Sequence, residues 1–301
     1  MRMILIIKRI GMAEFLILFR ETLEMALIVG IVSTYLVKTN SHRHLKVVGT
    51  AVVTAIISSI LLAFIFQSFM GGFSGFTEEV FEGVIMITAS ILLGSMVVWM
   101  AKNKGNATQL KDLTKQAINS KNAIYGIFAI IYLAVLREGI EIVLFLYSLM
   151  IKNGGVSILS SCMGSATAAL IGYLMYRKGK QLPISKFFNY SSFLLIIIAS
   201  GLLAHGVHEL EEANIIPYNK STSIIWDINP SLSEEQLAYN NTVEKHERIY
   251  PLFHEKGTIG SLAKAIFGYN GNPSKIEVLS WIVMTSTLLY LWRFYSNRRL
   301  L

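Results

Sequence analysis

Long apolar runs constrain this chain more than any other feature of its sequence. A run of about 18 or more apolar residues is long enough to cross a bilayer as a helix. The chain is 53% hydrophobic and 15% charged, whereas a soluble domain usually has about 25% charged residues. The sequence therefore predicts an all-α integral membrane protein. Its seven transmembrane helices are expected at residues 11–37, 47–70, 80–101, 123–150, 156–177, 187–210 and 276–295.

Charges between these runs predict how the chain is oriented. Lysine and arginine collect in cytoplasmic loops, so the net charge of +8 indicates such loops rather than a nucleic-acid surface. Loops one, three and five and the tail are basic, and the fourth loop holds only Lys152. The N-terminus is thus expected outside and the C-terminus inside. Arg2, Lys8 and Arg9 favour the opposite orientation, but the other basic residues outnumber them. The basic residues that carry this prediction are Lys38, Arg43, Lys46, Lys102, Lys104, Lys111, Lys115, Lys121, Arg177, Lys178, Lys180, Lys186, Arg293, Arg298 and Arg299.

Two copies of a charged motif interrupt the apolar runs. The letters R-E-T-L-E stand at residues 20–24 in the first run, and R-E-G-I-E stands at residues 137–141 in the fourth. Each ionised group at mid-bilayer costs at least about 2.5–3.5 kcal/mol on insertion scales. Such groups therefore need a partner or a use. Residues three apart lie on roughly one face of a helix, so the two glutamates of each motif can point to one place.

The motifs belong to an internal repeat. I-T-A-S-I-L-L-G at residues 87–94 resembles I-I-A-S-G-L-L-A at residues 197–204, so runs one to three resemble runs four to six. Because each unit holds three helices, the second copy is inverted, and inverted repeats place a substrate site at the midplane in many transporters. The expected organisation is a first three-helix repeat at 1–101, a basic cytoplasmic loop at 102–122, a second repeat at 123–212, an extracytoplasmic loop at 213–275, and a seventh helix with a basic cytoplasmic tail at 276–301.

Inverted packing would bring both motifs together near the middle of the membrane. The site would hold four carboxylates and two guanidinium groups, a net charge of −2 when all are ionised. Its members are Glu21, Glu24, Glu138 and Glu141, with the motif arginines Arg20 and Arg137. Carboxylate oxygens suit hard cations, and no cysteine accompanies them. The alternative is a buried Arg–Glu cluster that only locks two helices together, but such a cluster would have balanced charge.

Further acids and histidines lie at the expected outer ends of the helices. They would form an acidic vestibule that concentrates a cation before it reaches the midplane. The candidates are Glu14, Glu79, Glu82, His205, His208, Glu209 and Glu212. Spacings of four and then three place His205, Glu209 and Glu212 on one helix face. The alternative is a set of solvated helix ends, which we prefer for Glu78 and Glu211.

These motifs, in this order, resemble the oxidase-dependent iron permease family, which includes fungal high-affinity iron permeases and bacterial EfeU-type permeases. That family has two Arg-Glu-x-x-Glu motifs, in its first and fourth spans, within seven spans. Further similar segments are F-E-G-V at residues 81–84, H-E-L-E-E-A at 208–213 and I-F-G-Y-N-G-N-P-S-K-I-E-V-L at 266–279. One departure is Thr22, where glycine is usual in the family.

The resemblance implies a multi-pass permease, not an enzyme, that imports iron across the cytoplasmic (inner) membrane. It implies that the four motif glutamates carry the ion and that the arginines position them. Iron, as Fe³⁺ or Fe²⁺, would be the transported substrate, and no bound cofactor is expected. Extracytoplasmic partners are also implied: a multicopper ferroxidase in fungi, or an iron-binding protein and a haem peroxidase in bacteria. The compact chain is more similar to the bacterial members.

Other functions stay open at this point. The residues alone do not separate iron from another hard divalent cation such as manganese. An intramembrane enzyme could use a metal at His208 and Glu209, but the second histidine of a His-Glu-x-x-His site is missing. A structural or sensing subunit of an iron-oxidising complex would bind a partner and move no ion.

Overall fold

The fold was analysed in a computed structural model of the chain. It describes residues 11–70, 74–102, 107–120, 122–178, 184–217, 223–227, 234–243, 250–254 and 257–297. These ranges are helical with short connections, and their one β-type contact is an isolated antiparallel bridge between Ile224 and Ser274. The all-α class is thus confirmed for this part of the chain. The orientation charges that lie outside the described residues are Arg2, Lys8, Arg9, Lys104, Lys121, Lys180, Arg298 and Arg299.

Every predicted span corresponds to a long helix. These helices are α2 (Met12–Lys38), α3 (Leu45–Met70), α4 (Phe76–Lys102), α6 (Ala123–Asn153), α7 (Ile158–Lys178), α8 (Ile184–Glu212) and α12 (Lys275–Asn297). Shorter helices are η1 (His42–His44), α5 (Ala107–Ile118), α10 (Glu234–Thr242) and α11 (Thr258–Phe267). The long helices extend a few residues past the apolar runs, because helical hydrogen bonding continues into the polar ends.

Helix α6 extends further than its apolar run, and this changes the position of Lys152. The prediction that this lysine lies in the fourth loop is wrong, because α6 continues to Asn153. The helix ends at Gly154, whose φ of 69° is left-handed, a conformation that favours glycine as a C-terminal cap. Lys152 therefore lies in the last turn of α6 and is only 3% exposed.

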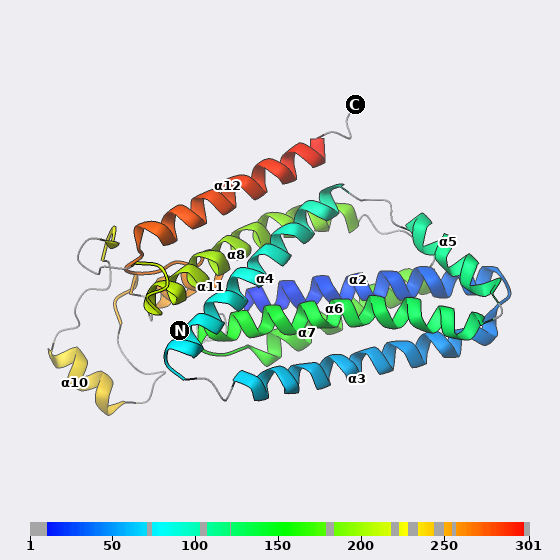
Figure 1. The fold of residues 1–301 in the computed structure, drawn as a ribbon, viewed down its shortest axis with the longest axis horizontal. Coiled ribbons are helices and arrows are strands. Elements are labelled where there is room, and N and C mark those ends of the chain that lie inside the picture. Colours follow the sequence, from blue (N-terminus) through cyan, green and yellow to red (C-terminus); the bar gives the residue numbers. More distant parts are fainter. Residues whose placement is uncertain are drawn as a thin grey trace.

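The long helices pack in pairs taken from the two halves of the chain. The most extensive pairs are α2 with α7, α4 with α8, and α3 with α6. In addition, α2 packs on α6, and α12 packs on α8 and α4. Figure 1 shows α2, α3, α6 and α7 running roughly side by side, with α4, α8 and α12 inclined across them. Neither half buries its apolar faces without the other.

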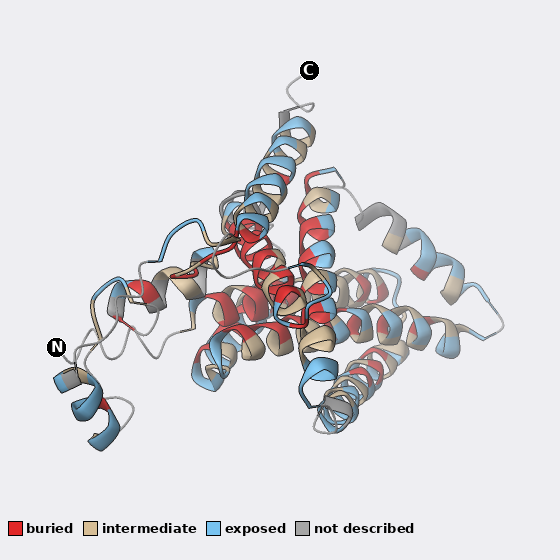
Figure 2. Cartoon of the chain, turned by 60° about the vertical axis from the view of Figure 1, so that its left-hand side comes forward, coloured by how far each residue is buried: buried red, intermediate tan, exposed pale blue. Residues whose placement is uncertain are grey.

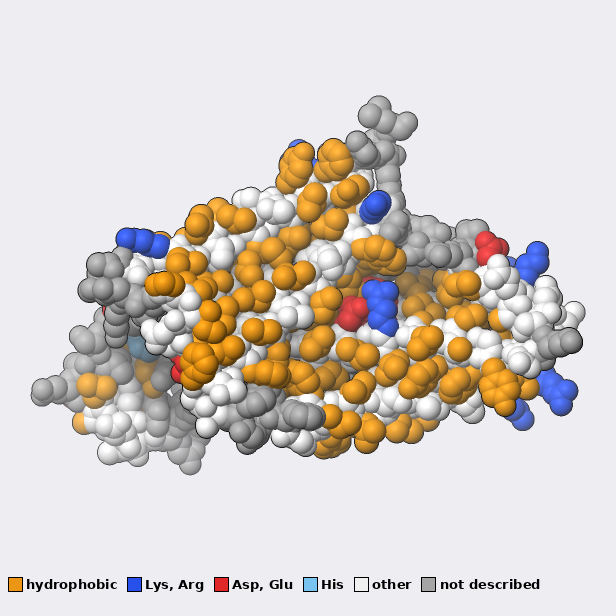
Figure 3. All heavy atoms as spheres, in the orientation of Figure 1, with side chains coloured by type: hydrophobic (Ala, Val, Ile, Leu, Met, Phe, Trp, Pro, Cys, Tyr) orange, Lys and Arg blue, Asp and Glu red, His pale blue; other side chains and the backbone are white. Residues whose placement is uncertain are grey.

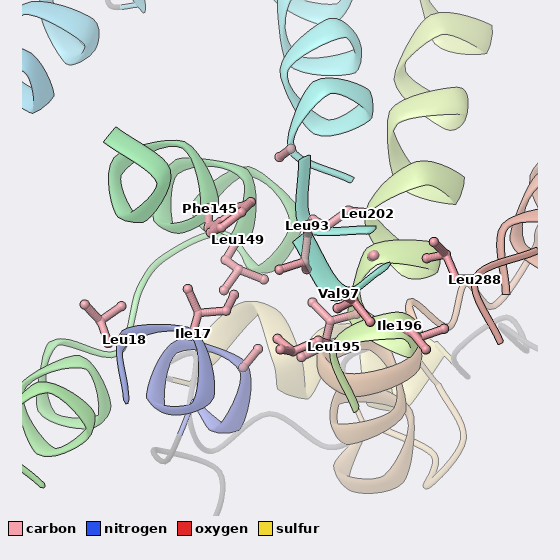
Figure 4. Packing of buried hydrophobic residues seen from close by; sticks show 14 residues of the cluster. Ile17, Leu18, Leu93, Val97, Phe145, Leu149, Leu195, Ile196, Leu202 and Leu288 are labelled. Atoms are coloured by element: carbon pink, nitrogen blue, oxygen red, sulfur yellow. The ribbon is translucent and has the colours of Figure 1, made fainter. Parts of the chain in front are cut away.

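One hydrophobic cluster joins five of these helices. Ile17 of α2, Leu93 of α4, Phe145 of α6 and Leu202 of α8 are 0% exposed, and Leu288 of α12 is 5% exposed. Figure 4 shows their side chains meeting at one place. Buried residues concentrate where the helices meet, while exposed ones lie on their outer faces (Figure 2).

A second hydrophobic cluster lies farther along α2 and α6 and includes α3. Its buried members are Val32, Leu36, Val48, Ala51, Ala55, Ile127, Ile131 and Val135. On α2 the motif at residues 20–24 falls between the two clusters, and on α6 the motif at 137–141 does the same. The charged motifs are therefore enclosed between two apolar layers.

The outer helix faces are apolar, as expected for contact with lipid. On α3 the side chains of Ile57, Leu61 and Phe64 are 60%, 60% and 65% exposed, and Figure 3 shows hydrophobic side chains over most of one face of the molecule. Within the described residues, four helices are long and apolar enough to cross a membrane: His42–Ser68, Phe76–Lys102, Ile158–Arg177 and Ser191–Glu212. In α2 and α6 the motif charges interrupt the apolar run.

The segment between α8 and α12 is more closely attached to the bundle than its polar composition predicts. Its helix α11 packs against α8, α2 and α6. The indole Nε1 of Trp281 on α12 donates a hydrogen bond to the carbonyl oxygen of Phe267 (2.9 Å). The phenol of Tyr269 donates to the carbonyl oxygen of Phe253 (3.1 Å). Part of this loop therefore lies against one end of the helix bundle.

Candidate functional site

The glutamates of the two motifs converge between α2 and α6. One carboxylate oxygen from each of Glu21, Glu138 and Glu141 lies within 4.8 Å of the others. Glu24 is an electrostatic neighbour of Glu141. Glu21 is 0% exposed and Glu138 is 3% exposed. The packing of the two helices thus assembles all four predicted carboxylates into one group, in which Glu21 and Glu138 are buried and Glu24 and Glu141 are partly exposed.

Several carboxylate oxygens of this group have no hydrogen-bond partner. Both oxygens of Glu21, Oε1 of Glu24 and Oε2 of Glu138 are buried and accept no hydrogen bond, although Arg20 lies within ion-pair range of Oε1 of Glu21 and of Glu24. Burying a carboxylate oxygen without a partner is costly, and it costs more when the group is ionised. Carboxylate oxygens held this way suit a hard cation, which would supply the missing interactions.

Arg20 supports the α2 half of the site from within the protein. The side chain is 1% exposed, and its guanidinium lies 3.8 Å from Glu21 and 3.2 Å from Glu24. Its Nη2 also donates to the sulfur of Met100 on α4 (2.7 Å). Because the group is buried among acids, Arg20 offsets part of their negative charge and holds them in place.

Arg137 occupies the matching position of the α6 motif but a different environment. Its Nε donates to Oε1 of Glu141 at 2.9 Å. The Arg137 side chain is 57% exposed, and its guanidinium lies 5.9 Å from the ring centroid of Trp99, within cation–π range. Figure 3 shows a basic and an acidic side chain in the middle of the otherwise apolar face. The repeated motif is therefore symmetric in sequence and unequal in burial.

The predicted outer candidates lie in three neighbouring sets that interact through His208. Glu209 on α8 interacts electrostatically with His208 and Glu212 of its own helix and with Glu82 and Glu79 on α4. Glu79 and Glu82 lie in the first turns of α4, and both are partly exposed. The packing of α4 on α8 thus brings three of the candidates together in one acidic group.

A second set lies near the buried end of α6. Glu14, which is 4% exposed, lies near Lys152. His205 is 6% exposed, and its electrostatic neighbours are Lys152, Lys264 and His208. His208 thus connects His205 to the outer acids Glu209 and Glu212. Lys152 is the residue that the sequence analysis missed here, although a lone lysine at the end of an apolar run was the available signal.

The third set centres on His208. Its Nε2 lies 3.2 Å from Oε1 of Glu212, and its Nδ1 lies 3.3 Å from Oε1 of Glu277 on α12. Glu211, which the sequence analysis treated as a solvated helix end, is instead 1% exposed. Glu277 was also missed, although Ser274-x-x-Glu277 before an apolar run is the sequence pattern of a helix capping box.

Comparison with known proteins identifies the family. The sequence profile of the iron permease FTR1 family matches residues 11–296. The chain belongs to the FTR1 iron permease family. The resemblance expected from the two motifs is therefore confirmed, and the alternative of an intramembrane enzyme is excluded because this is a family of permeases.

Relatives of the chain match over nearly its whole length. A protein named ferrous iron permease EfeU from Escherichia coli O6:H1 is 30% identical over 272 residues, which cover 89% of this chain and 90% of the relative. A protein of the same name from Yersinia pestis is 29% identical over 281 residues, or 92% of each chain. No solved structure matches the chain significantly. Membership of the family supports iron as the transported substrate, and the apolar helices fit a multi-pass membrane protein.

Proposed function

We propose that this permease imports iron across the cytoplasmic membrane through one site built from both Arg-Glu-x-x-Glu motifs. The observation that carries the proposal is the 4.8 Å cluster of oxygens from Glu21, Glu138 and Glu141. Four glutamates and two arginines have a net charge of −2 when ionised, so the group retains negative charge for a cation. A cluster that only locked two helices together would not need this excess.

The packing supports an inverted repeat of two three-helix units. In such a repeat α2, α3 and α4 of the first unit correspond to α6, α7 and α8 of the second. The contact between α2 and α7 then has an equivalent contact between α6 and α3. Both pairs are among the most extensive in the protein, and α4–α8 and α2–α6 map onto themselves. The hydroxyl of Ser90 donates to the carbonyl oxygen of Ala199 at 2.7 Å, which joins the two repeated strings directly. The site then lies where an inverted repeat places its substrate.

The lengths of the long helices support the proposal of seven transmembrane helices. The three remaining long helices, α2, α6 and α12, have 27, 31 and 23 residues, and about 20 residues cross a bilayer. We retain the N-terminus outside, the C-terminus inside, and the division into two repeats, a basic loop, an extracytoplasmic segment and a seventh helix.

An ion entering from outside would meet the outer acids before the central site. The proposed path runs from Glu79, Glu82 and Glu209 inward to the motif glutamates. Glu14, His205, His208 and Glu212 remain outer candidates beside it. Delivery by an extracytoplasmic iron-binding protein together with an oxidase or peroxidase accords with the family resemblance, and α11 and its neighbours offer it a surface.

Radioactive iron uptake into cells tests the proposal. We expect Glu21→Gln and Glu138→Gln each to abolish uptake, because each removes one of the clustered charges while preserving side-chain shape. Glu78→Gln, at an exposed position in the first turn of α4, is the matched control and should transport normally. All variants are compared at equal membrane levels.

Two further arms of the same assay define the substrate. Iron supplied as Fe²⁺ or as Fe³⁺ shows which form enters, and a tenfold excess of Mn²⁺ shows whether another hard cation competes. Uptake that survives both motif substitutions would mean that the central carboxylates are structural, and the proposed site would be abandoned.

A further inference from the structure

A second cluster of ligand-type side chains lies away from the motifs, where α8 ends and α12 begins. One ligand atom from each of His208, Glu211 and Glu277 lies within 4.8 Å of the others. His208 and Glu211 belong to the last turns of α8, whereas Glu277 belongs to the first turn of α12. Only the tertiary structure brings these residues together.

The cluster buries more negative than positive charge. Glu211 is 1% exposed and Glu277 is 2% exposed. In the part of the chain that the structure describes, the ion pairs of this region are those of His208 with Glu277 and with the half-exposed Glu212. Even with His208 protonated, the two buried carboxylates against one imidazolium leave a net charge of −1. Excess buried charge of this kind is strongly unfavourable unless a cation compensates it.

One buried oxygen of the cluster is also unsatisfied. Glu211 Oε1 accepts a hydrogen bond from the hydroxyl of Ser274 at 2.8 Å, but Glu211 Oε2 is buried and has no hydrogen-bond partner. A nearly fully buried carboxylate thus presents a free oxygen beside an imidazole and a second carboxylate. Glu211 Oε2 is therefore available as a metal ligand.

The surrounding hydrogen bonds hold the second carboxylate in place. Asn270 Nδ2 lies 3.2 Å from both oxygens of Glu277, and the backbone N–H of Ser274 donates to Glu277 Oε2 at 2.7 Å. The backbone N–H of Glu277 donates in turn to the Ser274 hydroxyl at 3.0 Å, which completes a capping box. Capping explains why Glu277 lies in the first turn of α12, but it explains neither the contact with His208 nor the unpaired oxygen of Glu211. Such outer hydrogen bonds are what orient metal ligands.

We propose that His208, Glu211 and Glu277 bind a divalent first-row transition-metal ion at the junction of α8 and α12. One imidazole and two carboxylates suit such ions better than they suit Ca²⁺ or Mg²⁺, which prefer oxygen ligands alone. The bound ion would connect the end of α8 to the start of α12. This site is separate from the motif glutamates, and its existence does not depend on the proposed transport mechanism.

The test is Co²⁺ binding to the purified full-length protein in detergent. Glu21→Gln/Glu138→Gln serves as the parent, so that the motif site does not contribute. We expect one tightly bound Co²⁺ per chain by equilibrium dialysis, and a higher melting temperature when Co²⁺ is added, because an ion that binds only the folded state stabilises it. Glu277→Gln, Glu211→Gln and His208→Gln should each weaken binding at least tenfold.

The variants are chosen so that loss of folding does not imitate loss of binding. Glutamine at position 277 preserves the capping box, and the melting temperature without metal reports folding. Glu235→Gln, on the exposed side of α10, is the matched control and should bind as the parent does. Absence of bound Co²⁺ in the parent, or unchanged binding in all three cluster variants, would overturn the proposal. Iron uptake is a separate readout, so the motif site and this site can fail independently.

Discussion

The crossing of α4 and α8 gives a quantitative test of the fold around the site. A Cβ atom added at Gly206 on α8 would lie 2.9 Å from the carbonyl oxygen of Gly83 and 3.1 Å from the backbone nitrogen of Ile87, both on α4. A comfortable carbon–oxygen contact is about 3.3 Å or longer, so Gly206→Ala requires the helices to separate by about 0.4 Å. Gly30 on α2 has no atom within 4 Å of the corresponding position, which makes Gly30→Ala the matched control.

The two substitutions share one energy term and differ in another. Replacing glycine by alanine inside a helix stabilises it by about 0.8–1.0 kcal/mol in either variant. Overpacking against a backbone costs about 1–3 kcal/mol and applies only to Gly206→Ala. The melting temperature of Gly206→Ala should therefore fall below that of Gly30→Ala by about 2–6 °C, at about 2 °C per kcal/mol for a large chain.

Circular dichroism melting of the two purified proteins in the same detergent measures this difference. Gly30→Ala should melt at or above the temperature of the unmodified protein. If Gly206→Ala melts as high as Gly30→Ala, the helices do not approach as closely as described, and the pairing of the repeated strings loses its support.

Two further substitutions probe the repeat and the buried arginine. Ser90→Ala removes the hydrogen bond between α4 and α8 and should lower the free energy of unfolding by about 0.5–1.5 kcal/mol. Ser200→Ala removes a hydrogen bond within α8 and should lower the melting temperature less. Equal shifts in melting temperature would contradict the interhelical role of Ser90. Arg20→Met leaves Glu21 buried without its cation and should cost about 3–5 kcal/mol, or about 6–10 °C. Combining Arg20→Met with Glu21→Gln should recover part of that loss, and a single-variant shift under about 2 °C would refute the buried pairing.

The sequence was sufficient to predict the helices and the central acids. Apolar length predicted where each long helix lies, because a run that crosses lipid must satisfy its backbone hydrogen bonds internally. The doubled motif predicted which carboxylates to examine, because charges are too costly in such runs to occur without a use. These are local properties, so they can be recognised without knowledge of the packing.

The outer candidates show where this reasoning ends. Helical spacing grouped His205 with Glu209 and Glu212, but it did not predict which charged residues lie beside each of them. His205 lies near Lys152, Glu209 near Glu79 and Glu82, and Glu212 beside His208. Spacing along one helix defines a face, and it does not specify what packs against that face.

Thus the sequence alone determined the helical membrane class, the family and the identity of the motif residues. Only the tertiary structure decided that Arg20 is buried while Arg137 is exposed, and that Glu211 and Glu277 meet at His208. The physical reason is that burial and pairing depend on contacts between helices distant in the chain. A repeated motif therefore predicts the same side chains in both halves, but the packing around each copy determines how far those side chains are buried and which residues they pair with.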